Sequence, residues 1–161
     1  MLDILIPNII LPGIVSLFMV WVGVQIWLKK QYRLIKNLSQ PIVFFDSRER
    51  KCEFEIDFLK ETDFFNVSIC SVEEERYWND LTNYSIIIIS YESIKGSAET
   101  HIEKIKREKK PVIIYTKPGE IDRGSDDMKA ILEYELAEIA NSPLRIINLI
   151  FSILSVKNYE N

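Results

Sequence analysis

The chain has 161 residues, of which 47% are hydrophobic, and its formal net charge is -4 at neutral pH. The first 40 residues hold four cations and one anion, so the remainder carries 16 Lys and Arg against 23 Asp and Glu. Because nucleic-acid affinity depends largely on cations that neutralise phosphates, this acidic remainder argues against a nucleic acid polymer as a partner.

Residues 4–28 form an uncharged stretch that is long enough to cross a membrane. As a helix rising about 1.5 Å per residue it reaches roughly 37 Å, against a hydrocarbon core of about 30 Å. A cleavable signal peptide would have a shorter apolar core of about 7 to 15 residues, with positive charge before it and a small-residue cleavage site after it. The stretch meets none of these conditions, so we expect a transmembrane anchor.

The cations that follow the stretch set its orientation. They are Lys29, Lys30, Arg33 and Lys36. By the positive-inside rule they place the long C-terminal part in the cytoplasm and the N-terminus outside, as in a single-pass protein of the inner membrane. We therefore predict an anchor and juxtamembrane helix at residues 1–40 and one cytoplasmic domain at residues 41–161. The helix is expected over residues 13–38, with its outer end kinked or frayed at Pro7, Asn8, Pro12 and Gly13.

After residue 40, short apolar runs alternate with charged stretches of helical period. Strands are expected at residues 42–45, 66–70, 86–89 and 111–115, with a weak fifth at 137–140. Helices are expected at residues 53–61, 73–81, 97–109, 126–138 and 143–156. This order predicts an α/β fold of the flavodoxin-like, receiver-like type, with a parallel sheet of four or five strands and helices on both faces.

Ligands of such sheets bind beyond the carboxyl ends of the strands. The polar residues at those ends are therefore the ligand-binding candidates. They are Asp46, Ser47 and Arg48 after the first strand, Ser90 after the third, Thr116 after the fourth, and Asn141 and Ser142 near the fifth.

Residues 42–47, 84–91, 111–116 and 141–144 resemble the four signature stretches of response-regulator receiver domains. That resemblance implies strand-end acids that hold Mg²⁺, a phosphoaccepting Asp after the third strand, a Thr or Ser after the fourth and a Lys before Pro at the fifth. The chain keeps Asp46 and Thr116, but Ser90 and Ser142 stand where the phosphoacceptor and the lysine should be. The resemblance therefore implies a degenerate receiver-like domain that is not phosphorylated on Asp and senses by binding.

The segment from Ser90 to Glu103 is also similar to the stretch after the third strand of Toll/interleukin-receptor-like domains. Under this alternative the chain is a membrane-tethered NAD-cleaving enzyme, with Glu103 as the catalytic carboxylate and Ser97 lining the pocket. No Trp precedes Glu103, and no glycine-bearing loop follows the second strand. Glu103 is otherwise one more exposed acid on a charged helix face.

Histidine and cysteine are scarce in the chain. Cys52 and Cys70 lack a CxxC spacing and are expected to be unpaired, and His101 is the only histidine. We therefore expect no metal site and no cofactor. Arg48, Arg50 and Lys51 cluster beside the first strand and would either receive a phosphate or nucleotide or form a solvated loop.

The last helix, residues 143–156, is apolar on nearly every face and, at about 21 Å, is too short to span a bilayer. One side should pack on the sheet and another should meet a second copy, the membrane surface or a neighbouring helix. We expect a homo-oligomer formed through this helix, the transmembrane helix or both, with a small ligand or protein as a further partner. The layout is that of a membrane-anchored signalling or regulatory protein, and it resembles the membrane-acting effectors of bacterial antiviral systems.

Overall fold

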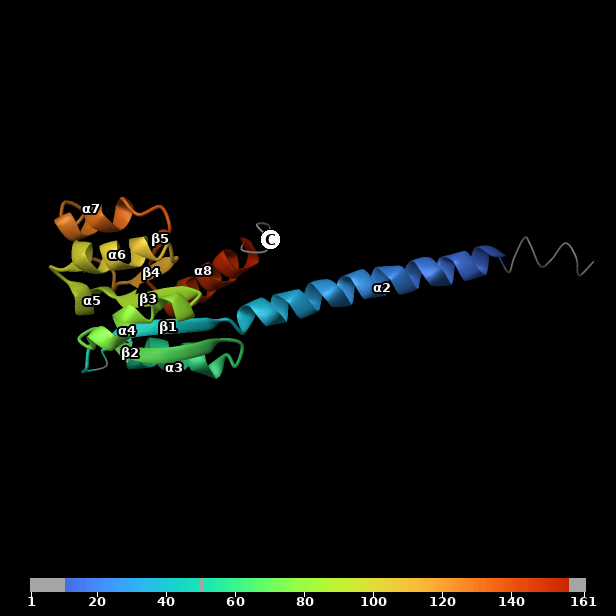
Figure 1. The fold of residues 1–161 in the computed structure, drawn as a ribbon, viewed down its shortest axis with the longest axis horizontal. Coiled ribbons are helices and arrows are strands. Elements are labelled where there is room, and N and C mark those ends of the chain that lie inside the picture. The colour runs from blue at the N-terminus through green and yellow to red at the C-terminus, as the bar shows by residue number, and fades with distance from the viewer. Residues whose placement is uncertain (1–10, 50, 157–161) are drawn as a thin grey trace, which may run out of the picture. The chain divides into compact units, whose positions relative to one another are not determined.

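The computed structural model describes residues 11–49 and 51–156. The chain divides into two compact units, Met1–Lys36 and Asn37–Asn161. Helix α2, Leu11–Leu38, accounts for the described part of the first unit and ends inside the second (Figure 1). It is the one helix among the described residues that is long and apolar enough to cross a membrane, and none of its apolar window is buried.

The expected helix over residues 13–38 thus begins two residues earlier than predicted. Pro12 and Gly13 lie within its first turn, where proline is tolerated because the first N–H groups have no partner inside the helix. The Ser16 hydroxyl donates to the Pro12 carbonyl at 2.8 Å. Pro7 and Asn8, where a kink was also predicted, lie outside the described residues.

The second unit is built on a five-stranded parallel sheet of order β2-β1-β3-β4-β5. This confirms the predicted flavodoxin-like, receiver-like fold, and the weak fifth strand is a full member of the sheet. The strands are β1 Pro41–Asp46, β2 Asn66–Ser71, β3 Ile86–Ser90, β4 Val112–Tyr115 and β5 Ala137–Ala140.

Among the described residues, five helices and one short 3-10 helix connect these strands, and a sixth helix follows β5. They are α3 Glu53–Glu61, α4 Glu75–Asn79, η2 Leu81–Asn83, α5 Tyr91–Ile94, α6 Ala98–Arg107, α7 Asp126–Leu132 and α8 Pro143–Val156. Two predicted helices are too long: the one at residues 73–81 is shortened to α4, and the one at residues 126–138 ends at Leu132. The second error arises because residues 137–140 pair with β4 instead of continuing α7. The one-turn helix α5 was not predicted.

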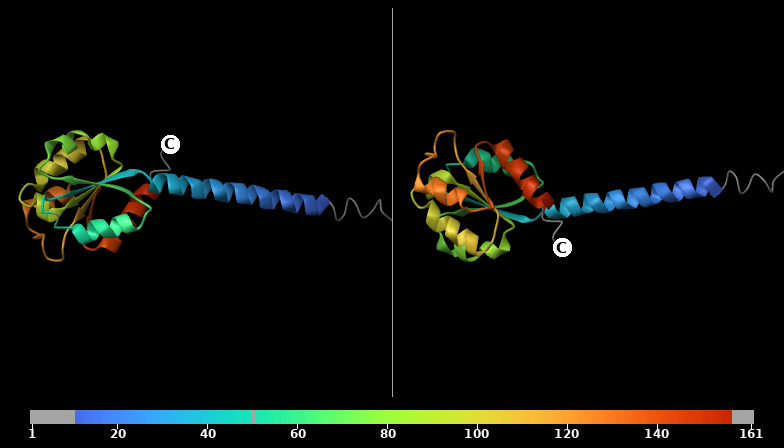
Figure 2. Two further views of the ribbon diagram at one scale, coloured as in Figure 1. Left: turned by 90° about the horizontal axis from the view of Figure 1, so that it is seen from below. Right: turned by 90° about the horizontal axis from the view of Figure 1, so that it is seen from above.

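Successive side chains of a strand point to opposite faces, so each strand contributes to two cores. On one face, Val43, Phe45, Ile87 and Ile89 pack against α4, α5, α6 and α7. On the other face, the alternate residues pack against α3 and α8: Ile42, Phe44, Ile86, Ile88 and Ile113. Figure 2 shows the helices on the two sides of the sheet. Burial on both faces explains why β3 is an uninterrupted isoleucine run before Ser90.

Helix α8 completes the second core. Ile146, Ile150 and Leu154 are buried, and Phe151 meets Phe65 edge-on at 5.5 Å between ring centroids. The side of α8 that was predicted to meet a partner beyond the sheet is therefore partly covered by the same domain. Leu144, at the start of the helix, is 63% exposed.

The last residues of α2 belong to this core as well. Leu38 is 7% exposed and packs in the layer that includes Ile150 and Leu154. The Asn37 side-chain amide donates to the Leu154 carbonyl at 3.2 Å. That carbonyl lies in the last turn of α8, where helical carbonyls lack partners of their own.

Replacing Ile88 by Ala should lower the free energy of unfolding by about 2–5 kcal/mol, because Ile88 is fully buried at the centre of the sheet. The measurement is urea unfolding of the intact chain in mild detergent, followed by near-ultraviolet circular dichroism. Leu132→Ala is the control, since Leu132 is 67% exposed and should change stability by no more than about 0.5 kcal/mol. Equal losses in the two variants would contradict the assignment of the core.

Candidate functional site

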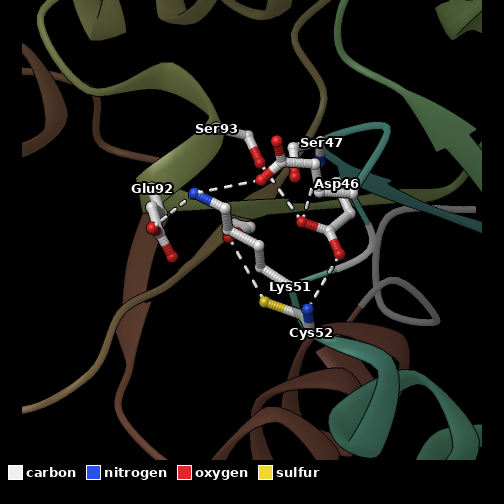
Figure 3. Close-up of polar contacts among 8 residues, drawn as sticks. Asp46, Ser47, Lys51, Cys52, Glu92 and Ser93 are labelled. Carbon is white, nitrogen blue, oxygen red and sulfur yellow. Dashed lines mark hydrogen bonds and ion pairs between the residues drawn. The ribbon is translucent and has the colours of Figure 1, made fainter.

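Asp46 ends β1 and is 1% exposed, so its carboxylate depends on hydrogen bonds from the protein. Oδ1 accepts from the Ser47 backbone N–H at 2.8 Å and from the Ser93 hydroxyl at 3.2 Å. Oδ2 accepts from the Cys52 backbone N–H at 2.9 Å. Figure 3 shows these contacts around the carboxylate. Both oxygens of the acid that the resemblance assigned to Mg²⁺ therefore already accept from the protein.

Ser90 ends β3 and stands where receiver domains carry the phosphoacceptor. It is 2% exposed, and its hydroxyl oxygen lies 3.3 Å from the Cys52 Sγ, which donates to it. Burial raises the pKa of the Cys52 thiol to about 11, while the contact with Ser90 opposes that rise. Cys52 and Cys70 are both free and buried. The centre of the site is thus a neutral thiol and hydroxyl beside one carboxylate.

An ion pair outside this centre joins the loop after β1 to helix α5. The Lys51 Nζ lies 2.8 Å from the Glu92 carboxylate and 3.7 Å from that of Glu49 (Figure 3). The hydrogen bond with Lys51 lowers the pKa of Glu92, and the one with Glu92 raises the pKa of Lys51. Lys51, predicted as a phosphate-receiving cation or a solvated loop residue, is exposed in the turn before α3 and pairs with Glu92 of α5. Arg50 lies outside the described residues.

The Thr116 side chain makes its hydrogen bonds within the loop after β4. Its hydroxyl donates to Glu120 at 3.0 Å, and the same carboxylate oxygen accepts from the Lys117 backbone N–H at 2.8 Å. Thr116 is 7% exposed. The predicted hydroxyl is therefore buried and engaged by an acid that the sequence analysis did not select.

Asn141 and Ser142 precede α8. Asn141 is exposed, and the Ser142 hydroxyl accepts from the Arg145 backbone N–H at 3.3 Å. This contact resembles an N-terminal helix cap, in which a side-chain oxygen receives one of the unpaired N–H groups of the first turn. Ser142, at the position of the receiver lysine, therefore contacts the start of a helix.

Ser47 and Arg48 face a different environment from Asp46. Both line a cleft of about 230 Å³ at the carboxyl ends of β1 and β2, together with Ile69, Glu74 and Tyr77. In the described part of the chain, the Ser47 hydroxyl oxygen is buried and lacks a hydrogen-bond partner. Leaving such a group unpaired costs about 1–3 kcal/mol. This cleft is the accessible part of the strand-end region.

Glu103 lies elsewhere, in a groove of about 300 Å³ between α6 and α7. Its neighbours there include Lys106, Lys129 and Glu133, and its own side chain is exposed. Ser97 contacts the Ile94 carbonyl and His101. The NAD-cleaving role of Glu103 stays a prediction.

The sequence analysis missed Cys52, Ser93 and Glu120. Cys52 immediately precedes α3, so its N–H is one of the free donors expected at a helix start, which is the signal that would have linked it to Asp46. Ser93 lies three residues after Ser90, within the unpredicted helix α5. Its contact with Asp46 joins residues 47 positions apart and leaves no local pattern.

No protein-family model and no curated protein matches the sequence significantly. Solved structures do match the fold. A Burkholderia pseudomallei protein named as related to pilus assembly is 12% identical, with 74% of this chain and 91% of that chain covered at a TM-score of 0.54. The receiver domain of the Pseudomonas aeruginosa sensor histidine kinase PA1611, with magnesium ion coordinated in its active-site cleft, is 9% identical. The match covers 73% of this chain and 98% of that chain, at a TM-score of 0.54.

The receiver domain of the Francisella response regulator 1452 is 12% identical, with 74% of this chain and 99% of that chain covered at a TM-score of 0.51. At these identities the comparisons show the fold alone. The domain is receiver-like, as the strand-end pattern predicted.

Replacing Asp46 by Asn should lower the free energy of unfolding by about 1–3 kcal/mol. The amide nitrogen cannot accept, so at least one of the donors at Ser47, Cys52 and Ser93 loses its partner. Urea unfolding of the intact chain measures the loss. Asp126→Asn removes an exposed carboxylate paired with Lys129 and should change stability little. A neutral effect of Asp46→Asn would contradict the role of the carboxylate.

In a Cys70→Ser background, Cys52 should react with iodoacetamide at pH 8 at least about a hundredfold more slowly in the folded chain than in urea. The thiolate is the nucleophile, and burial moves the Cys52 pKa from 9.0 to about 11, so the thiolate fraction falls by roughly that factor. Mass spectrometry of the alkylated chain gives both rates. Similar folded and unfolded rates would show that the thiol is open and ionised.

Proposed function

We propose that this chain is a single-pass membrane-anchored regulatory protein whose cytoplasmic receiver-like domain acts by binding and self-association, without aspartyl phosphorylation. The anchor would lie in the inner membrane with the N-terminus outside. A role in bacterial stress or antiviral response is a prediction from this layout.

The proposal rests on the residues that form the strand-end centre, namely Asp46, Cys52 and Ser90. Ser90, not Asp, ends β3, and its hydroxyl accepts from the Cys52 thiol. Asp46 accepts from the protein through both oxygens. Acyl phosphate formation needs a carboxylate that can attack, and the residue at the acceptor position has none. A change of state would therefore come from a bound molecule or another copy.

Anchoring is supported by α2. The apolar part of this helix is exposed in the isolated chain. Three lysines lie in the C-terminal part of the same helix: Lys29, Lys30 and Lys36. Exposure of so many apolar side chains to water is unfavourable, at about 25 cal/mol per Å². Lipid would remove that cost, and the lysines would contact anionic headgroups.

A route between anchor and domain is supported by the last turn of α2. Leu38 is part of the domain core and Asn37 donates to Leu154 in α8. A shift of α8, the helix that we propose for self-association, would thus act on the residues that end α2. The exposed Leu144 at the start of α8 is available for a second copy.

The test treats the intact chain in nanodiscs with acetyl phosphate and, separately, with beryllofluoride, using an active receiver domain as the positive control. We expect no phosphoprotein and no beryllofluoride-dependent change in the amide spectrum. Phosphate incorporation that hydroxylamine removes would identify an acyl phosphate and contradict the proposal.

The same chain should remain in the membrane pellet after alkaline carbonate extraction and should cross-link to itself. Leu144→Asp should weaken cross-linking at least several-fold without releasing the chain from the pellet. Recovery of the chain in the soluble fraction, or cross-linking that never exceeds that of an unrelated single-pass protein, would contradict the membrane and self-association parts respectively.

A further inference from the structure

We infer that the cleft at the carboxyl ends of β1 and β2 binds a small molecule through a phosphate group, with Ser47 and Arg48 as its principal ligands. The inference rests on the proposed function, because it names the chemical class of the molecule that the domain would bind.

Accessibility selects this cleft over the strand-end centre. Asp46, Ser90 and Thr116 are at most 7% exposed and are already hydrogen-bonded to the protein. Ser47 and Arg48, which directly follow Asp46, line an open cleft instead. A molecule arriving from solvent therefore meets the Arg48 side chain without breaking the contacts that hold the centre. The Ser47 hydroxyl oxygen is buried in the wall of the cleft and would have to turn toward that molecule to bind it.

The polar groups of the cleft favour an anion. In residues 11–49 and 51–156, the Arg48 guanidinium has no ion pair, and it offers five N–H donors in a planar fork. The Ser47 hydroxyl has no hydrogen-bond partner in the same residues. Two donor groups next to each other in sequence, neither with a partner of its own, suit the several acceptor oxygens of a phosphate.

The acids near the cleft are engaged. Glu74 lines the cleft, but its carboxylate pairs with Arg76 at 2.8 Å. Glu73 accepts from the Ser71 hydroxyl, which lowers the pKa of Glu73. Their charges are therefore partly compensated. Arg48 also contributes to the lowered pKa of Glu73, although among the described residues it forms no ion pair with that acid.

Size and shape limit the ligand. The cleft of about 230 Å³ is smaller than the roughly 300–1,000 Å³ of sites for drug-sized molecules. Ile69 and the Tyr77 ring supply apolar surface beside the polar groups. The Arg76 guanidinium lies 4.6 Å from the centroid of that ring, so Tyr77 already holds one cation. Inorganic phosphate, or the phosphate end of a nucleoside monophosphate whose nucleoside stays outside, fits these dimensions.

The experiment titrates the intact, isotope-labelled chain in detergent micelles with inorganic phosphate and with AMP, at constant ionic strength. We expect saturable amide shifts at residues 47, 48, 71 and 77. Arg48→Gln should weaken binding at least tenfold and Ser47→Ala several-fold. Arg107→Gln, the same change at an exposed position of α6, should leave binding unchanged.

Tighter binding of AMP than of phosphate would identify an organic phosphate monoester, and equal binding would identify phosphate itself. Shifts that do not saturate, or equal affinities for the wild type, Arg48→Gln and Arg107→Gln, would overturn the inference. Circular dichroism of each variant shows that it is folded. Failure here leaves membrane retention and cross-linking intact, so it is distinguishable from failure of the proposed function.

Discussion

The buried carboxylate of Asp46 is the constraint around which the strand-end region is organised. A charge that is 1% exposed is tolerated only where donors surround it, and three donors do so here. They come from the loop after β1, the start of α3 and helix α5. The carboxylate thereby joins segments that are 47 positions apart, and the Lys51 to Glu92 ion pair reinforces the same connection on the outside.

This arrangement gives the receiver-like fold a different use of its strand ends. The Pseudomonas aeruginosa receiver domain coordinates a magnesium ion in its active-site cleft. In this chain Asp46, at the end of β1, accepts from backbone and hydroxyl donors, and a thiol donates to the serine at the end of β3. The open surface lies to one side, between β1 and β2. That cleft is the position for which we propose phosphate binding.

The sheet and its two helical layers could be predicted from the sequence because a continuous apolar run, such as residues 86–89, is typical of a strand that is buried on both faces. Local signals failed where tertiary pairing overrode them. The helix predicted to reach residue 138 ends at Leu132, because residues 137–140, also predicted as a weak strand, pair with β4. The candidate residues were selected correctly as strand-end residues, yet their separation into a buried group and an open group depends on side-chain direction. Asp46 and Ser47 are adjacent in sequence and have opposite environments.

The position of α8 in the chain has a consequence for biosynthesis. Ile146, Ile150 and Leu154 cover a sheet face whose strands are all translated earlier. Until these residues have left the ribosome, that side of the sheet lacks the cover of α8, and exposed apolar surface of this kind makes a nascent domain prone to aggregation. Only a chain that contains α8 can therefore close its second core.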